Sequence, residues 1–176
     1  MTFDLVTIPC RTDNYAFLVV DRTSSKAALI DAPEAGPIQS VLDQSGLLLT
    51  DILITHHHDD HISAVEELAL PTTRIVGARA DAHRLPKLDL AVTEGETFTL
   101  FGVDVDVIDV PGHTVGHVAY YIEDVGALFT GDSLMALGCG RLFEGTAQQM
   151  WESLTKLMAY PSDTKVCSGH EYTASN

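Results

Sequence analysis

The sequence predicts a layered α/β fold in which two sheets pack together and helices lie outside them. Short apolar runs bounded by turn residues fill both halves of the chain, and a helical segment follows each set of runs. Apolar residues make up 45% of the 176 residues, which is typical of a globular protein and not of a disordered acidic chain. At this length one domain buries roughly 70% of the surface that its unfolded chain exposes, so we expect a single domain.

The first half begins with three strand-like runs at 3–8, 15–21 and 27–31. A charged, serine-containing turn at 21–26 separates the second run from the third, which favours an antiparallel meander. A helix is expected around 38–45, and Gly46 is its predicted C-terminal stop. The run 51–55 is typical of a buried strand and leads directly into a histidine-rich loop. A helix over 61–68 follows, and Pro71 prevents its extension.

The second half continues the pattern, with strands expected at 74–77, 97–100, 103–110, 118–122 and 127–130. Turns at 101–102 and 123–126 separate neighbouring strands. Thr146 begins the clearest helix, because Gln149 completes a capping box three residues later. A short strand at 164–167 comes last. The apolar residues of the helix recur at helical spacing, so we expect all of them to pack in the core: Ala147, Met150, Trp151, Leu154, Leu157 and Met158.

The charge balance limits the classes of partner. There are 25 acidic and 10 basic residues, for a formal net charge of −15. This acidity argues against nucleic acid or an anionic membrane as the main partner. It leaves an anionic substrate open, since a bound metal ion can reverse the local field.

Cysteine usage and the N-terminus indicate the compartment. The three cysteines are too widely spaced for a zinc ribbon or a disulfide framework, which favours a reducing compartment: Cys10, Cys139 and Cys167. The first 21 residues carry early charges and lack the basic and apolar regions of a signal peptide. No apolar run approaches the roughly 18 residues that a membrane span needs. We therefore expect a soluble cytoplasmic protein. A monomer is the expected oligomeric state.

The string THHHDDH at 55–61 is the most informative part of the sequence, with four of the chain's eight histidines. Residues two apart in an extended segment project to the same side, so His56 and His58 can reach one metal ion together. Asp60 and His61 fall where the chain turns into a helix and can face a second ion. Neutral imidazole and carboxylate suit zinc, iron or manganese. The alternative is a solvated polar loop.

Three further ligand candidates lie where predicted strands end. His113, Asp132 and His170 each follow a glycine, which lets the backbone turn so that the side chain points inward. Taken singly, each is typical of a turn residue or of a hydrogen-bonded core histidine. Together with the four candidates of the histidine-rich loop, they complete two coordination shells.

Five motifs carry a resemblance to a known family: THHHDDH (55–61), PGHTVGH (111–117), GDSL (131–134), GCGRLFEGTAQQMWESL (138–154) and GHEYTASN (169–176). On these motifs the chain resembles the metallo-β-lactamase superfamily and, within it, the glyoxalase II (hydroxyacylglutathione hydrolase) family. The first three motifs are typical of the superfamily, and the last two are more specific to glyoxalase II. The resemblance covers essentially the whole chain. It implies a four-layer αββα sandwich with residues 1–176 as the catalytic domain.

The resemblance also implies a role for each candidate. It places a first ion on His56, His58 and His113, and a second ion on Asp60, His61 and His170. Asp132 would bridge both ions, with zinc as the first choice and iron or manganese as alternatives. Asp60 and Asp132 would act with a metal-bridging hydroxide. Asp31 lies where the superfamily has a carboxylate that orients a ligand histidine, although a simple strand-end turn residue is an equal alternative.

The implied substrate is a glutathione thioester. Arg141, Phe143 and Tyr172 would lie beside the glutathione moiety, with Arg141 offering a cation to a carboxylate. Many family members have tyrosine where this chain has Phe143, so one hydroxyl contact is expected to be missing. Family members usually continue past GHEYTASN into a helical domain. We expect that domain to be absent and glutathione to bind more weakly as a result.

The predicted reaction is the hydrolysis of S-lactoylglutathione to lactate and glutathione, a step of methylglyoxal detoxification. A thiol has a pKa of about 8.5, so the thiolate leaves without a strong general acid. Two alternatives stay open: a glutathione persulfide dioxygenase with a single iron, and a catalytically impaired metal-binding domain. Cys139 as nucleophile and a β-lactamase activity are disfavoured, because the loop that contains Cys139 matches glyoxalase II.

Overall fold

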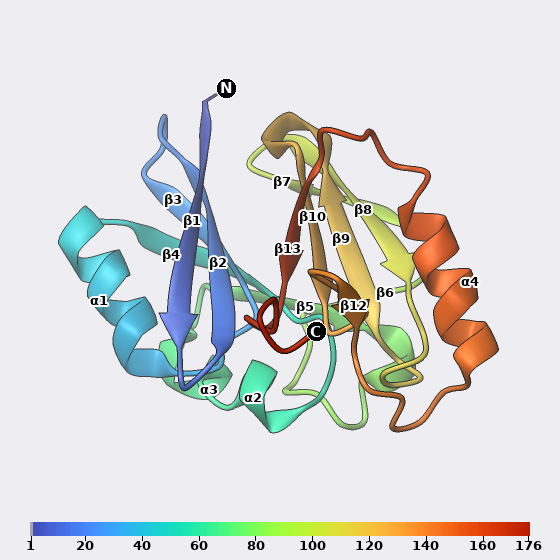
Figure 1. Cartoon of the computed structure of the whole chain (residues 1–176). Helices are drawn as coiled ribbons and strands as arrows, with labels where there is room; N and C mark the ends of the chain where they lie inside the picture. Colours follow the sequence, from blue (N-terminus) through green and yellow to red (C-terminus); the bar gives the residue numbers. More distant parts are fainter. Residues whose placement is uncertain (1) are drawn as a thin grey trace.

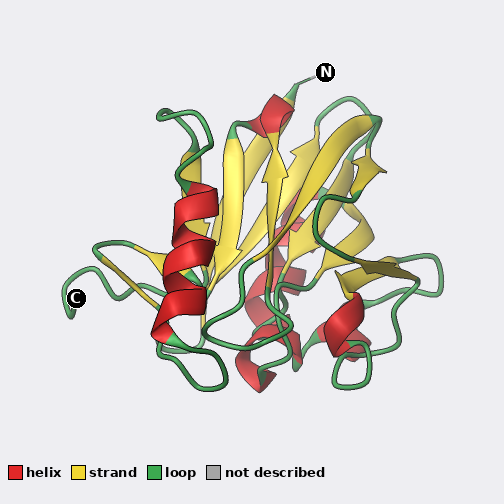
Figure 2. Ribbon diagram, turned by 90° about the vertical axis from the view of Figure 1, so that its right-hand side faces the viewer, coloured by secondary structure: helices red, strands yellow, loops and turns green. Residues whose placement is uncertain are grey.

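Two β-sheets lie face to face between helices, as the computed structural model shows for residues 2–176, the part of the chain that it describes (Figure 1). Helix α1 (Ala35–Ser45) covers the outer face of the sheet built by the first half of the chain. Helix α4 (Ala147–Leu157) covers the outer face of the other sheet (Figure 2). The predicted αββα sandwich is therefore confirmed.

The N-terminal sheet contains six strands in the order in which they occur along the chain. The first three pair antiparallel, which is the predicted meander, and the others add in parallel. The parallel connections pass through α1, through the short helices α2 (Asp59–Ile62) and α3 (Val65–Leu68), and through the 3-10 turn η1 (Arg79–Asp81). The six strands are β1 (Phe3–Cys10), β2 (Asn14–Asp21), β3 (Lys26–Ile30), β4 (Leu48–Leu53), β5 (Arg74–Ala78) and β6 (Leu90–Val92).

The C-terminal sheet contains five strands in the order β13-β10-β9-β8-β7. All its pairs are antiparallel except β10 with β13, which α4 connects. A 3-10 turn η2 (Glu123–Val125) joins β9 to β10, and β11 (Leu134–Met135) pairs with β12 (Gly138–Cys139) as a separate hairpin. The five strands are β7 (Thr97–Leu100), β8 (Val103–Asp109), β9 (Val118–Ile122), β10 (Ala127–Gly131) and β13 (Lys165–Ser168).

The central strands are buried on both faces, which explains why their sequences are almost continuously apolar. In β2, Phe17 and Val19 point into the core between the two sheets, whereas Leu18 points toward α1. The rings of Phe17 and Phe129 meet across the sandwich with centroids 5.8 Å apart. Alternation along the strands thus divides the apolar residues between an inner core and a core under the helices.

Local sequence signals set several boundaries as predicted. Gly46 ends α1 in the left-handed conformation with φ of 61°. Thr146 accepts a hydrogen bond from the backbone N–H of Gln149, and the Gln149 side chain accepts one from the N–H of Thr146. These reciprocal bonds form the expected capping box. None of the helices in residues 2–176 is long and apolar enough to cross a lipid bilayer.

The structure corrects two helix predictions. In place of the single helix expected over 61–68, the structure has two short helices, and the first of them begins two residues earlier than expected. The helix is interrupted because the chain bends at Ala64, with φ of −96° and ψ of 0°. The apolar stripe of α4 is only partly buried. Met150 and Leu157 face the sheet, whereas Trp151 is 67% exposed and Met158 is 74% exposed. The sheet contacts a narrower arc of α4 than the arc over which the apolar stripe extends. Strands β6, β11 and β12 were not predicted, since they are only two or three residues long.

One buried hydroxyl links the two sheets. Tyr120 on β9 is fully buried, and its hydroxyl donates a hydrogen bond of 2.8 Å to the backbone carbonyl of Ile54, just after β4. We expect Tyr120→Phe to lower the free energy of unfolding by about 1–3 kcal/mol, because a buried carbonyl loses its donor. Urea denaturation monitored by fluorescence measures this change.

The matched control is Tyr121→Phe. Tyr121 is 7% exposed, but its ring lies on the other face of β9 and packs on Tyr160, with centroids 4.4 Å apart. We expect this variant to lose less than half as much stability as Tyr120→Phe. Equal losses would show that the bond between the sheets contributes nothing specific.

Candidate metal centre

All seven predicted ligands lie together, although they come from four separate segments of the chain. The histidine-rich loop follows β4, His113 follows β8, Asp132 follows β10 and His170 follows β13. In Figure 1 the C-terminal segment, drawn in red, lies between the two sheets above α2. Three groups of these side chains have ligand atoms within 4.8 Å of one another: His56, His58 and His113; His56, His61 and Asp132; and Asp60, His61 and His170.

The first group brings three ring nitrogens together. His58 Nδ1 lies 3.2 Å from His56 Nε2 and 3.0 Å from His113 Nε2. The other nitrogen of His56 donates to the Thr55 hydroxyl at 3.0 Å, and that of His113 donates to the Arg141 carbonyl at 2.7 Å. The inward nitrogens of these two rings therefore carry lone pairs, and both are directed at the same nitrogen of His58.

The surroundings of the three histidines of the first group favour neutral imidazole rings. Burial lowers the pKa of His56 well below its usual value, and burial also lowers the pKa values of His58 and His113. A proton on His58 can satisfy only one of the two facing lone pairs. A cation placed among the three nitrogens would satisfy all of them, so the geometry fits a metal ion.

Asp132 lies between the group of His56, His58 and His113 and the group of Asp60, His61 and His170. Its Oδ2 atom is 3.3 Å from Nε2 of His113 and 3.3 Å from Nε2 of His170, and its Oδ1 atom is 3.3 Å from Nε2 of His61. Asp60 Oδ2 lies 3.3 Å from His170 Nε2 and 3.7 Å from His61 Nε2. The two carboxylates and three imidazoles thus share one small volume.

The electrostatics around Asp60, His61 and His170 differ from those of the first group. Burial opposes the charged form of His61, yet the Asp31 and Asp132 carboxylates raise its pKa to about 10. Burial likewise opposes a charge on His170, whose pKa the Asp132 and Asp60 carboxylates raise to about 10. The hydrogen bond with His170 lowers the pKa of Asp60. The buried carboxylates therefore demand positive charge, from protonated imidazoles or from cations.

Two buried atoms give an independent test of metal fit. His61 Nε2 and Asp132 Oδ1 have no hydrogen-bond partner among residues 2–176. Buried polar atoms are nearly always paired, so these two atoms, which face each other at 3.3 Å without forming a hydrogen bond, fit a cation between them. The donor set of imidazole and carboxylate suits zinc, iron or manganese, and the residues present fit divalent ions.

Asp31 lies behind the candidate ligands and is also a turn residue. Its backbone has φ of 55° at the end of β3. Its carboxylate accepts hydrogen bonds of 2.8 Å from His61 Nδ1, from the Thr55 N–H and from the Thr55 hydroxyl. Because Thr55 in turn accepts from His56, one buried carboxylate orients two candidate ligands.

Two supporting residues that sequence analysis missed are Asp13, in the turn between β1 and β2, and Asn14, at the start of β2. Asp13 Oδ1 accepts a 2.9 Å hydrogen bond from His170 Nδ1. The Asn14 amide donates to Asp60 Oδ2 at 3.0 Å and to the Asp60 carbonyl at 3.1 Å. In the sequence this segment is an ordinary polar turn. Its partners lie 157 and 46 residues away, so no local pattern indicates the contacts.

Glycines next to the ligands provide space and backbone conformation. Gly131 has φ of 48°, a conformation that favours glycine, and it turns Asp132 toward the histidines. Gly169 acts differently, because its φ is not positive. A Cβ atom there would lie 2.5 Å from Asp132 Oδ1 and 2.7 Å from His61 Cε1. The predicted backbone role thus holds at Gly131, whereas Gly169 supplies room for close packing.

The three residues predicted to bind substrate all line a cavity of about 950 Å³, which is also lined by five of the seven candidate ligands: His58, Asp60, His113, Asp132 and His170. Phe143 stands edge-on to His58 and His113, with ring centroids 5.6 and 5.3 Å away, and the Arg141 guanidinium lies 5.9 Å from its ring. Tyr172 stacks on His170 at 4.8 Å with an interplanar angle of 7°. Phe143 therefore lies beside the group of His56, His58 and His113, and Tyr172 lies beside the group of Asp60, His61 and His170.

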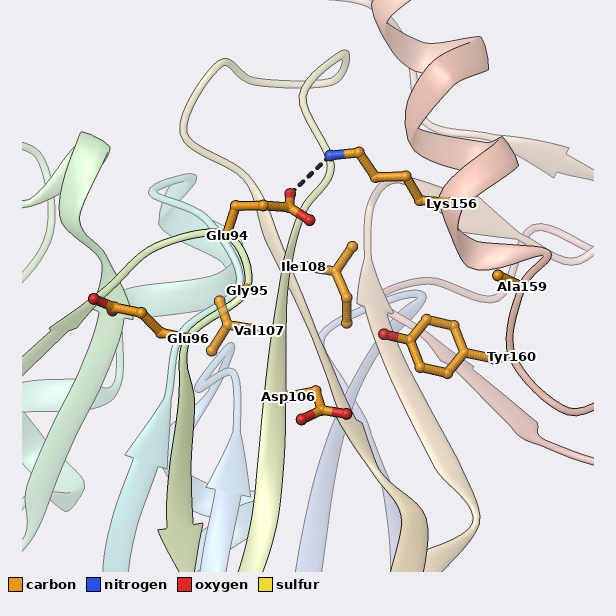
Figure 3. Close-up of a pocket in the computed structure, with 9 residues that line it drawn as sticks. All are labelled: Glu94, Gly95, Glu96, Asp106, Val107, Ile108, Lys156, Ala159 and Tyr160. Carbon is orange, nitrogen blue, oxygen red and sulfur yellow. Dashed lines mark hydrogen bonds and ion pairs between the residues drawn. The ribbon is translucent and has the colours of Figure 1, made fainter.

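A second cavity, of about 330 Å³, opens beside α4 and differs in character (Figure 3). Acidic side chains such as Glu94, Glu96 and Asp106 dominate it, and Lys156 forms an ion pair of 2.7 Å with Glu94 at its rim. None of its lining residues is a candidate ligand. Among the described residues, five of the candidate ligands and the predicted substrate-binding residues therefore line the larger cavity and not this one.

Comparison with known proteins gives a consistent result. The metallo-β-lactamase superfamily matches residues 11–170. The hydroxyacylglutathione hydrolase of Ruegeria pomeroyi is 59% identical over 179 residues, and the alignment covers 100% of this chain and 69% of that protein.

Two solved structures have similar folds. The B3 metallo-β-lactamase BLEG-1 superimposes with a TM-score of 0.87 at 24% identity, over 96% of this chain and 92% of that one. TTHA1623, solved in a di-iron-bound form, has a TM-score of 0.77 at 28% identity, over 96% of this chain and 92% of that one. With the family match and the identity to the Ruegeria protein, these results show that the chain belongs to the metallo-β-lactamase superfamily and, within it, to the hydroxyacylglutathione hydrolase family.

Proposed function

We propose that the chain hydrolyses glutathione thioesters, converting S-lactoylglutathione to lactate and glutathione, with two divalent metal ions. The main observation behind this proposal is the position of Asp132. Its carboxylate lies within 3.3 Å of His113, from the proposed first ligand set, and of His61 and His170, from the proposed second set. The names of the curated relatives support the substrate class. The di-iron form of TTHA1623, a structural relative, supports a pair of ions.

Each ligand has a proposed place. His56, His58 and His113 would hold one ion, Asp60, His61 and His170 the other, and Asp132 would hold both. When bound, such ions lower the pKa of water toward neutrality and stabilise negative charge on a polarised carbonyl. Zinc is the proposed metal, because this donor set is one that zinc prefers, and iron and manganese accept the same donors.

The other residues of the cavity would bind the substrate. Arg141 is exposed at the rim and offers a guanidinium to a glutathione carboxylate. The rings of Phe143 and Tyr172 would exclude water from the two sides of the reacting thioester. The departing thiolate needs no protonation by the chain, because a thiol has a pKa of about 8.5. Residues 1–176 would thus form the catalytic domain.

Replacement of the bridging carboxylate tests the proposal. We expect Asp132→Ala to lower kcat for S-lactoylglutathione more than about a hundredfold, beyond what partners behind the ligands contribute. A chelator should abolish the activity of the unmodified chain, and added zinc should restore it. Release of free thiol measures each rate.

The control is Asp104→Ala, which removes an exposed carboxylate on β8 away from the cavity. Its kcat should match that of the unmodified chain. Full activity of Asp132→Ala, or activity that resists the chelator, would contradict a metal-dependent hydrolase.

Asp31→Asn tests the support behind the ligands. The substitution weakens the acceptor for His61 and Thr55, so we expect metal affinity to fall about 10- to 100-fold. Competition with a chromophoric chelator measures the affinity. Asp21→Asn is the control, since Asp21 is also buried but contacts only Thr23 and Ser24 in a turn. A similar loss of affinity in both variants would refute a specific role for Asp31.

Metal content separates the hydrolase from a persulfide dioxygenase. We expect two metal ions per chain by elemental analysis, and no oxygen uptake when glutathione persulfide is added. One iron per chain together with oxygen uptake would identify the dioxygenase and refute the hydrolase.

A further inference from the structure

Four ionisable side chains form a connected cluster beside the metal centre, which we name the Arg84 cluster: His57, Asp81, Arg84 and Glu144. The Arg84 guanidinium donates to Asp81 Oδ1 at 2.6 Å through its terminal nitrogen and at 3.2 Å through Nε. It also donates through both terminal nitrogens to the Glu144 carboxylate. Asp81, 1% exposed, completes the cluster by accepting from His57 Nδ1 at 3.0 Å. One guanidinium thus joins two carboxylates in forked geometry.

The cluster contacts the metal centre at two points. His57 is the residue between the candidate ligands His56 and His58. Asp81 packs directly on the loop that contains His113, because a Cβ atom on Gly116 would lie 2.2 Å from the Asp81 carboxyl carbon. Asp81 is therefore held against the His113 loop, and Arg84 is hydrogen-bonded to Asp81.

The outer end of the cluster holds the segment that presents the substrate-binding residues. Glu144 directly follows Phe143, and its carboxylate accepts a 2.8 Å hydrogen bond from the Val115 N–H. The Arg84 guanidinium lowers the pKa of Glu144 to about 2, so this carboxylate is charged at neutral pH. The last residue of segment 141–144, Glu144, is thus an ionised carboxylate that binds both Arg84 and the Val115 N–H.

Segment 141–144 and the His113 loop are one unit. The Phe143 N–H donates to the His113 carbonyl at 3.2 Å, and the Gly145 N–H donates to the Gly112 carbonyl at 3.0 Å. His113 Nδ1 donates in turn to the Arg141 carbonyl at 2.7 Å. A displacement of this segment would therefore move Arg141 and Phe143 together.

The segment has little apolar packing to hold it. Leu142 is 39% exposed and Phe143 is 60% exposed. An exposed segment without buried apolar side chains samples many conformations unless polar contacts restrain it. The forked ion pair between Arg84 and Glu144 is the side-chain restraint at its end.

We propose that Arg84, fixed by Asp81, positions segment 141–144 through Glu144, so that Arg141 and Phe143 meet the glutathione part of the substrate. The proposal rests on the proposed glutathione thioesterase function. Arg84, Asp81 and Glu144 are positioning residues in it, since none of them touches the reacting atoms. Their role is to discriminate glutathione thioesters from thioesters that lack the tripeptide.

The test compares two substrates in one variant. Glu144→Gln keeps the size of the side chain and an acceptor for the Val115 N–H, but it removes the charge that Arg84 binds. We expect KM for S-lactoylglutathione to rise about tenfold, the effect of losing one charged hydrogen-bonded contact. KM for a lactoyl thioester of a small neutral thiol should stay unchanged, because that substrate has no carboxylate for Arg141. The metal content should stay unchanged, because the substitution leaves the backbone hydrogen bonds between the segment and the His113 loop in place.

A second variant and a control complete the test. Arg84→Lys keeps the charge but loses the fork, and it should raise KM for S-lactoylglutathione in the same selective way. Lys156→Met breaks an exposed ion pair of 2.7 Å with Glu94 at the second cavity and should leave both KM values unchanged. Thermal unfolding of each variant shows whether the fold is intact.

The outcomes are distinct. A selective rise in KM in either folded variant supports the positioning role. Equal changes for both thioesters, loss of metal, or no change in KM would overturn it while leaving the thioesterase function in place. Failure of the unmodified, metal-loaded chain to hydrolyse S-lactoylglutathione would overturn the proposed function, and this inference with it.

Discussion

The burial of the Asp132 carboxylate is the constraint on which the rest of the centre depends. Asp132 is 5% exposed and lies within 3.3 Å of three imidazoles. A buried carboxylate must be compensated by positive charge. Although burial opposes a charge on His61 and His170, Asp31 and Asp132 raise the pKa of His61, and Asp132 and Asp60 raise that of His170. The same carboxylates favour cations in this space. Close packing around Asp132 requires Gly169, where any side chain would collide with its Oδ1 atom. His117 supports it from below, accepting a 3.0 Å hydrogen bond from its backbone N–H.

The scaffold orients the candidate ligands through the ring nitrogens that face away from the centre. Thr55, the Arg141 carbonyl, Asp31 and Asp13 each accept from one of these rings, and each acceptor belongs to a different segment. Three of these hydrogen bonds form within one half of the chain, and only the bond between Asp13 and His170 joins the first half to the second, so the position of the His170 ring depends on the packing of the two sheets. In the proposed function the same arrangement links binding with chemistry, because the segment whose carbonyl orients His113 also carries Arg141 at the rim of the cavity.

Most of the fold could be predicted because its signals are local. Strand 97–100 and strand 118–122 agree with the structure at both ends, and the capping box at Thr146 starts α4 where expected. The errors arise where tertiary packing decides. Trp151 has the spacing of a core residue yet is 67% exposed, since the sheet covers only one narrow arc of α4. The short helices α2 and α3 replace one helix because the chain bends at Ala64 beside the ligands.

The sequence by itself determined which residues are candidates for the metal centre, because histidine and aspartate after apolar runs are chemically distinctive and their motifs resemble a known family. Only the tertiary structure decided how these residues are supported. Asp13 and Asn14 look like an ordinary turn, and Asp81, Arg84 and Glu144 look like scattered surface charges. Their partners come from segments far away in the chain, and a hydrogen bond or ion pair between distant residues exists only once the sheets and loops have brought its two ends together.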